Sequence, residues 1–217
     1  SAYAAGVYHL MTHAFFKALL FLAAGSVIIG MHHDQDIRNM GGLRKLMPIT
    51  YWTSLLGSLA LIGTPFFSGF FSKDTIIEAV HHSQLPGAGV VHFAVLLGVF
   101  ITALYSFRMY FLVFHGKPRM DAHTREHLHE TPWVVTGPLI ALAVFSVISG
   151  YVIGPVVFGD FFDGIIHVAP EHGALAVVAE HYHGILGFVL HAFAAPAVYL
   201  AAAGVALAWY MTLKNPG

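Results

Sequence analysis

The chain has 217 residues, of which 57% are hydrophobic and only 10% are charged. Soluble domains carry about 25% charged residues, so this composition excludes an ordinary soluble domain and indicates an integral membrane protein. Ten Lys and Arg against eleven Asp and Glu give a net charge of −1, which excludes the basic field that nucleic-acid binding needs. Cysteine is absent, which excludes disulfides and thiolate metal sites.

Five apolar regions are long enough to cross about 30 Å of hydrocarbon, which takes about 20 helical residues. They cover residues 3–30, 48–81, 88–115, 132–158 and 184–213. None shows the two-residue alternation of barrel strands. The sequence therefore predicts an all-α polytopic transmembrane helix bundle of about five spans, with 1–217 as one partial domain. Because a complete span begins at once, without a signal sequence, we expect a piece of a longer protein.

The second region is too long for one straight helix. Its roughly 34 residues would extend about 50 Å at 1.5 Å per residue, well beyond the bilayer. Gly63 and Pro65 weaken helical backbone, while Ser72 is suited to cap a new half-helix that has Asp74 in its first turn. We expect two half-helices joined by an unwound stretch near 63–71, an arrangement that marks ion sites in transporters. The alternative is one long, tilted helix with a proline kink.

Lys and Arg alternate between the loops that join the five regions. Loops 31–47 and 116–131 carry three each, whereas loops 82–87 and 159–183 carry none. Five crossings require such an alternation, and the positive-inside rule places the two basic loops in the cytoplasm. The first region is then expected to run from outside to inside.

The first region carries three ionisable side chains on one face. At 100° per residue, His9, His13 and Lys17 fall within an arc of about 80°. Lys17 lies near the middle of the span, where a lysine costs about 2.5–3.5 kcal/mol unless it faces a partner or water. Because histidine titrates near neutrality, the stripe predicts a proton path of about 12 Å along the helix axis. For each histidine alone, the plain alternative is a hydrogen bond between helices.

A second ionisable site is expected at the break, where Lys73 and Asp74 are neighbours. Adjacent helical residues do not face each other, so each should have its own partner. Glu78 lies one turn beyond Asp74 and is expected near the aqueous end. The residues predicted to carry proton transfer are Lys17, His13, His9, Lys73 and Asp74, with no cofactor or metal bound by this chain.

Several segments resemble one family. Residues 9–26, HLMTHAFFKALLFLAAGS, and 35–43, QDIRNMGGL, resemble the subunit L family of bacterial NADH-quinone oxidoreductase, an antiporter-like subunit of respiratory complex I. Residues 69–74, GFFSKD, and 105–109, YSFRM, look like the same family further along. The resemblance covers essentially the whole chain and implies a C-terminal fragment of the antiporter-like domain, whose mitochondrial counterpart is subunit 5.

The resemblance implies that His9, His13 and Lys17 match a central hydrophilic axis and that Lys73 and Asp74 match an exit route. It implies a proton-translocating subunit whose charge changes are driven by quinone reduction elsewhere in the complex. FMN, iron–sulfur clusters and quinone would belong to other subunits. The partners would be other membrane subunits, notably the adjacent antiporter-like subunit, with lipid and protons, in the bacterial inner membrane.

Two alternatives remain open at this point. Subunits of multisubunit Na⁺/H⁺ antiporters and membrane-bound hydrogenases share this core, and a lateral helix beyond Gly217 would distinguish them from complex I. A b-haem electron carrier would need histidines at matching depth on facing spans. His191 is the plausible partner of His9 or His13 in that case.

Overall fold

The computed structural model describes residues 2–168, 173–180 and 182–215, and every regular element in that part of the chain is helical. This confirms the predicted all-α bundle. The α-helices of the described residues are, in chain order, α1 (Tyr3–Gly30), α2 (Pro48–Ile62), α3 (Ser68–His81), α4 (Ala88–Phe114), α5 (Ala122–His127), α6 (Trp133–Ile148), α7 (Ala174–Glu180), α8 (Gly184–Ala192) and α9 (Pro196–Trp209).

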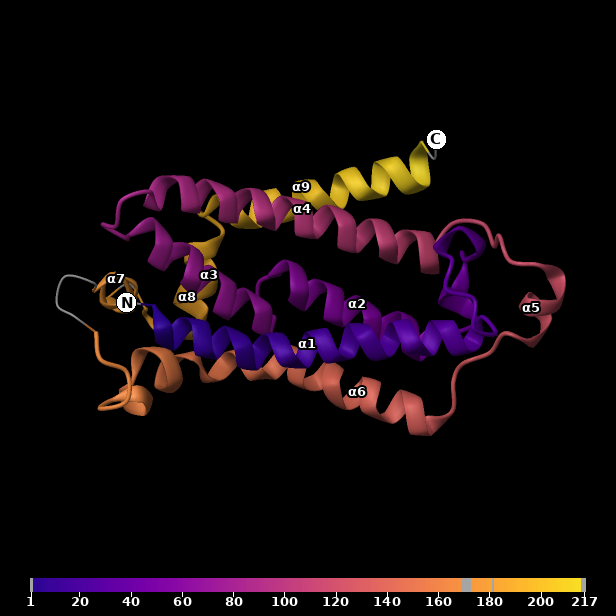
Figure 1. The fold of residues 1–217 in the computed structure, drawn as a ribbon, viewed down its shortest axis with the longest axis horizontal. Helices are drawn as coiled ribbons and strands as arrows, with labels where there is room; N and C mark the ends of the chain where they lie inside the picture. Colours follow the sequence, from indigo (N-terminus) through magenta and orange to yellow (C-terminus); the bar gives the residue numbers. More distant parts are fainter. Residues whose placement is uncertain (1, 169–172, 181, 216–217) are drawn as a thin grey trace.

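The long helix α1 lies between the half-helices and α6 (Figure 1). The half-helices α2 and α3 pack along one side of it, and α6 packs along the other. The helix α4 packs along α2 and α3, and α9 packs against α4. Buried surfaces of α1, α2 and α3 therefore face one another at the centre, where the predicted site residues lie.

Four helices of the described chain are long and apolar enough to cross a membrane: Tyr3–Gly30, Ala88–Phe114, Trp133–Val152 and Pro196–Lys214. The apolar helix α2 is shorter, with 15 residues, and α3 has 14. At 1.5 Å per residue, each covers only about 21–23 Å. They follow each other along α1 (Figure 1), so the second crossing is made by two half-helices, as predicted.

The region predicted as one span over 184–213 is divided in the structure. α8 ends at Ala192, and α9 begins at Pro196 after a short connection. Proline has no N–H for a preceding carbonyl, and it forces the residue before it into extended backbone; Ala195 has φ −84° and ψ 144°. Only the second part, Pro196–Lys214, has the length of a span.

The region predicted over 132–158 is a regular α-helix only as far as Ile148. Tighter 3₁₀ backbone follows over Ser149–Val152, and a wider π turn over Gly154–Phe158. Gly150, Gly154 and Pro155 explain the change, because glycine loosens a helix and proline removes one of its donors.

The two basic loops lie at the same end of the bundle, which we call the basic end (Figure 1). The Arg119 guanidinium donates to the carbonyls of Ile37, at 3.1 Å, and Arg38, at 2.9 Å. The Gly42 N–H donates to the His115 carbonyl at 3.0 Å. Loops 82–87 and 159–168 lie at the other end, which we call the far end.

Glu130 fixes the start of α2 at the basic end. Its carboxylate accepts from the backbone N–H groups of Ile49, at 2.7 Å, and Thr50, at 3.1 Å, and from the Thr50 hydroxyl at 2.7 Å. The first N–H groups of a helix lack internal partners and carry partial positive charge, so a carboxylate is stabilised there. The buried Ser26 hydroxyl bonds to those of Thr50 and Thr131, which ties α1 to α2 and to the start of α6.

Candidate functional site

The helix α2 ends in a Schellman motif. Gly63 has a left-handed φ of +78°, and its N–H donates to the Ala60 carbonyl at 3.2 Å. The Thr64 N–H donates to the Leu59 carbonyl at 3.0 Å. Glycine adopts this conformation without a steric penalty, so the local sequence ends the helix where the break was predicted.

A second turn leads into α3. It is closed by a 3.1 Å hydrogen bond from the Phe67 N–H to the Thr64 carbonyl, with Pro65 in the second position, which proline favours. Phe66, in the third position, has φ +73°, a conformation that costs a non-glycine residue about 1–2 kcal/mol. The Tyr151 hydroxyl donates to the Phe66 carbonyl at 3.1 Å and holds the turn against the end of α6.

The break is shorter than expected, and the predicted cap is wrong. α3 begins at Ser68, so the unwound stretch covers residues 63–67 rather than 63–71. Ser72 is therefore inside α3 and does not cap it. The tight turn at Pro65 uses few residues, so helical backbone resumes one turn earlier than the sequence indicated.

Lys73 is bonded to the free end of α2. Its ammonium group donates to the Leu61 carbonyl. That carbonyl lacks a helical donor, because Pro65, four residues further on, has no N–H and the Thr64 N–H is used by Leu59. The last carbonyls of a helix carry partial negative charge, which stabilises a cation there. The break therefore leaves the Leu61 carbonyl free to accept a hydrogen bond from the Lys73 ammonium group inside the bundle.

Ser72 connects α1 to α3. Its hydroxyl lies 2.9 Å from His9 Nδ1 and 2.8 Å from the Thr12 hydroxyl. Ser72 and Thr12 are completely buried, so these hydrogen bonds are protected from competing water. The histidine at the start of the predicted stripe thus reaches the residue next to Lys73.

Lys17 lies two turns along α1 from His9 and is half-buried. The rings of His9 and His13 are 5.6 Å apart between centroids. Lys17 interacts electrostatically with His13 and with Lys73. Within residues 2–168, 173–180 and 182–215, no carboxylate forms an ion pair with Lys17. Its charge is thus balanced by no fixed counter-ion in the described chain.

Asp74 faces a different side of α3. Its side chain is 3% exposed, and Oδ2 has no hydrogen-bond partner among the described residues. Together with Lys73, Gly63 and Ile77 it lines a small cavity of about 10 Å³. Asp74 interacts electrostatically with Glu78, one turn further along the helix. The neighbours Lys73 and Asp74 thus have different partners.

The structure brings His9, His13, Lys17 and Lys73 together between α1, α2 and α3, whereas Asp74 faces a small cavity that α4 and α9 also line. It adds three groups that were not predicted to belong to the site: the hydroxyl of Ser72, which was predicted only as a cap, the hydroxyl of Thr12 and the carbonyl of Leu61. Hydroxyls both donate and accept, so such a line can pass protons between ionisable groups. Thr12 offered a sequence signal, because it lies between the two histidines of the stripe.

The described residues contain no group of three His, Asp or Glu side chains placed to hold a metal ion. His9 is bonded to Ser72, whereas His191 lines a separate cavity beside Glu78. The facing histidines that a b-haem carrier needs are therefore not formed by this pair.

The fold and the site define a multi-pass helical membrane protein with ionisable side chains inside its bundle. A family model described as NADH:quinone oxidoreductase/Mrp antiporter, TM, matches residues 1–115. The chain belongs to this family, which confirms the resemblance seen in its motifs.

The relatives are named as subunits of the same family that the motifs resemble. The chain is similar to NADH-quinone oxidoreductase subunit L of Neisseria meningitidis serogroup A, with 55% identity over 100% of the chain and 35% of the relative. Subunit L of Rhodobacter capsulatus is 44% identical over 79% of the chain and 25% of the relative. NADH-ubiquinone oxidoreductase chain 5 of Rhizopus stolonifer is 37% identical over 92% of the chain and 32% of the relative. The chain thus spans about a third or less of the length of these curated relatives.

Proposed function

We propose that this chain is part of a proton-translocating membrane subunit of an NADH:quinone oxidoreductase. The names of the relatives and of the matching family support this assignment. In the whole complex, FMN, iron–sulfur clusters and quinone reside in other subunits, and this chain contributes only proton transfer. Its partners are other membrane subunits, including the adjacent antiporter-like subunit, in a bacterial inner membrane.

The observation that carries the proposal is the polar connection across the break. It leads from Lys17 and His13 through His9 to Ser72 and then to the neighbouring Lys73 and Asp74. Lys17 and Lys73 carry like charges that interact, so a change of charge at one alters the potential at the other. A charge change driven from elsewhere in the complex would in this way move a proton along the path toward Asp74.

Replacing Ser72 with Ala tests this connection. The substitution removes the hydroxyl that joins His9 to α3 and keeps a small, helix-favouring residue. A loss of about 1 kcal/mol in one transfer step slows that step about fivefold, so we expect proton translocation per NADH oxidised to fall. The measurement is proton uptake by proteoliposomes that contain the full complex.

Ser68→Ala is the matched control. Ser68 lies one turn earlier on the same helix and donates to the Ser146 carbonyl at 2.7 Å, away from His9. Assembled Ser68→Ala complex should keep the wild-type ratio of protons to electrons. Equal ratios for Ser72→Ala and wild type would contradict the proposed path.

The orientation of the chain is a separate prediction. We propose that loops 31–47 and 116–131 lie in the cytoplasm, because each carries three Lys or Arg, whereas loop 82–87 carries none. A cysteine placed at Ser83 should react with a membrane-impermeant maleimide in intact cells. A cysteine at the exposed Arg125 should react only after the cells are permeabilised. The opposite pattern would reverse the orientation.

A second candidate function comes from the family description, which also names Mrp antiporters. In that case, the same connection would exchange protons for sodium without NADH oxidation. Sodium-driven proton release by the purified complex in the absence of NADH would favour this candidate.

A further inference from the structure

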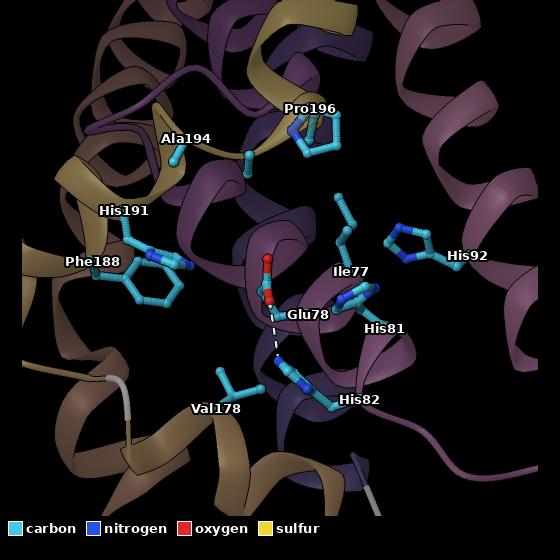
Figure 2. Close-up of a pocket in the computed structure, with 12 residues that line it drawn as sticks. Ile77, Glu78, His81, His82, His92, Val178, Phe188, His191, Ala194 and Pro196 are labelled. Carbon is cyan, nitrogen blue, oxygen red and sulfur yellow. Dashed lines mark ion pairs between the residues drawn. The ribbon is translucent and has the colours of Figure 1, made fainter.

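The far end of the bundle holds a cavity that the proposed path does not use. It has a volume of about 410 Å³ and lies between α3, α4 and α8 (Figure 2). We call it the imidazole vestibule because four histidines and one carboxylate line it: Glu78 and His81 of α3, His82 directly after α3, His92 of α4, and His191 of α8. The other residues that line it are apolar; Val178 is the contribution of α7.

The titratable groups of the vestibule are close to one another. Glu78 Oε2 lies 3.6 Å from His82 Nε2, and this contact is drawn as a dashed line in Figure 2. The ring of His81 lies 4.9 Å from that of His92 and 5.1 Å from that of His82 between centroids. A neutral imidazole has one N–H donor and one acceptor nitrogen, so neighbouring imidazoles can pass protons along hydrogen bonds.

The vestibule adjoins the small cavity beside Lys73 and Asp74. Ile77 and Ala197 line both cavities and form the wall between them. The smaller cavity, at about 10 Å³, is near the size at which one water begins to fit. Asp74 on one side of this wall and Glu78 on the other are one helical turn apart and interact electrostatically.

We propose that the imidazole vestibule is the proton-release site of this chain and that Glu78 receives the proton from Asp74. The protonated Asp74 gives its proton to the Glu78 carboxylate, and Asp74 becomes a carboxylate again. Glu78 then passes the proton to His82, and the resulting imidazolium releases it to water at the far end. The apolar side chains of Ile77 and Ala197 separate the vestibule from the cavity beside Asp74, so the proton crosses between the two carboxyl groups. This inference rests on the proposed function, because it requires Asp74 to carry a proton.

Replacing Glu78 with Gln in the full complex tests the inference. Glutamine keeps the shape of the side chain but does not take up a proton, so proton release should slow about 10²-fold or more. We expect the ratio of protons to electrons in proteoliposomes to fall in Glu78→Gln and to recover in large part in Glu78→Asp. Glu180→Gln is the matched control, because Glu180 is an exposed carboxylate of α7 at the same end and does not line the vestibule.

A comparison with Lys17→Ala separates this inference from the proposed function. If Glu78→Gln translocates protons at the wild-type ratio while Lys17→Ala does not, the release site is wrong and the proposed function stands. If both variants keep the wild-type ratio, the proposed function is wrong as well.

A second measurement does not depend on Glu78. In proteoliposomes with the vestibule facing the lumen, the wild-type translocation rate should depend on luminal pH. His82→Gln/His92→Gln should have a flatter dependence, with Asp74, Glu78, His81 and His191 still present. Identical pH profiles for this variant and wild type would overturn the proposal.

Discussion

Replacing Lys17 with Ala is expected to stop proton transfer through this subunit of the assembled complex. Lys17 lies near the middle of α1, on the face that carries His9 and His13, and no carboxylate of the described chain lies at ion-pair distance from it. Loss of a positioned acid or base slows proton transfer by about 10²–10⁴-fold. Alanine favours helix, so α1 should remain intact. The measurement is the number of protons moved per NADH oxidised in proteoliposomes.

Two further variants separate charge from proton exchange. Lys17→Arg keeps the positive charge, but a guanidinium does not give up its proton at any working pH, so this variant should also fail. Lys45→Ala removes an exposed lysine from the basic end and should translocate normally. Recovery of translocation in Lys17→Arg would mean that only the charge matters. If the Lys17→Ala complex assembles and moves as many protons per NADH as wild type, then His9, His13 and Lys17 have only a structural role.

The half-helices could be predicted from the sequence, because the length of the region and its helix-weakening residues are both local features. A region of about 34 apolar residues overshoots the bilayer, and Gly63 and Pro65 each weaken helical backbone within it. The face shared by His9, His13 and Lys17 follows from the helical period alone. These features needed no knowledge of which helices touch.

The features that the sequence did not predict depend on contacts between distant residues. Ser72 resembled a cap by its position, but its role comes from packing against His9, 63 residues earlier in the chain. The Leu61 carbonyl accepts from Lys73 only because the Schellman turn leaves that carbonyl without a helical donor. Glu130 caps α2 from 80 residues away, and no local pattern points to it. Pro196, in contrast, was a local signal that the region 184–213 is divided. We predicted one span there because the whole region is hydrophobic.

The largest effect on folding is expected from replacing Gly69 with Ala. Gly69 lies in the first turn of α3, where the helix crosses the end of α2, and a Cβ atom there would lie 1.8 Å from the Ala60 carbonyl oxygen. Overpacking costs about 1–3 kcal/mol when neighbouring side chains can move. Here the obstacle is the backbone of α2, so α3 itself must shift and the cost should be at or above this range.

A cost above about 1.4 kcal/mol changes the ratio of folded to misfolded chain about tenfold. We therefore expect the ratio of assembled to unassembled subunit to fall at least tenfold in Gly69→Ala, as measured by native electrophoresis of solubilised membranes. Gly98→Ala is the matched control, because a Cβ atom at Gly98 of α4 meets nothing within 4 Å. Alanine there should be neutral or stabilising by about 0.5–1 kcal/mol, since glycine weakens a helix interior. If Gly69→Ala assembles as well as Gly98→Ala, the close crossing of α2 and α3 is wrong, and with it the position of Lys73 at the end of α2.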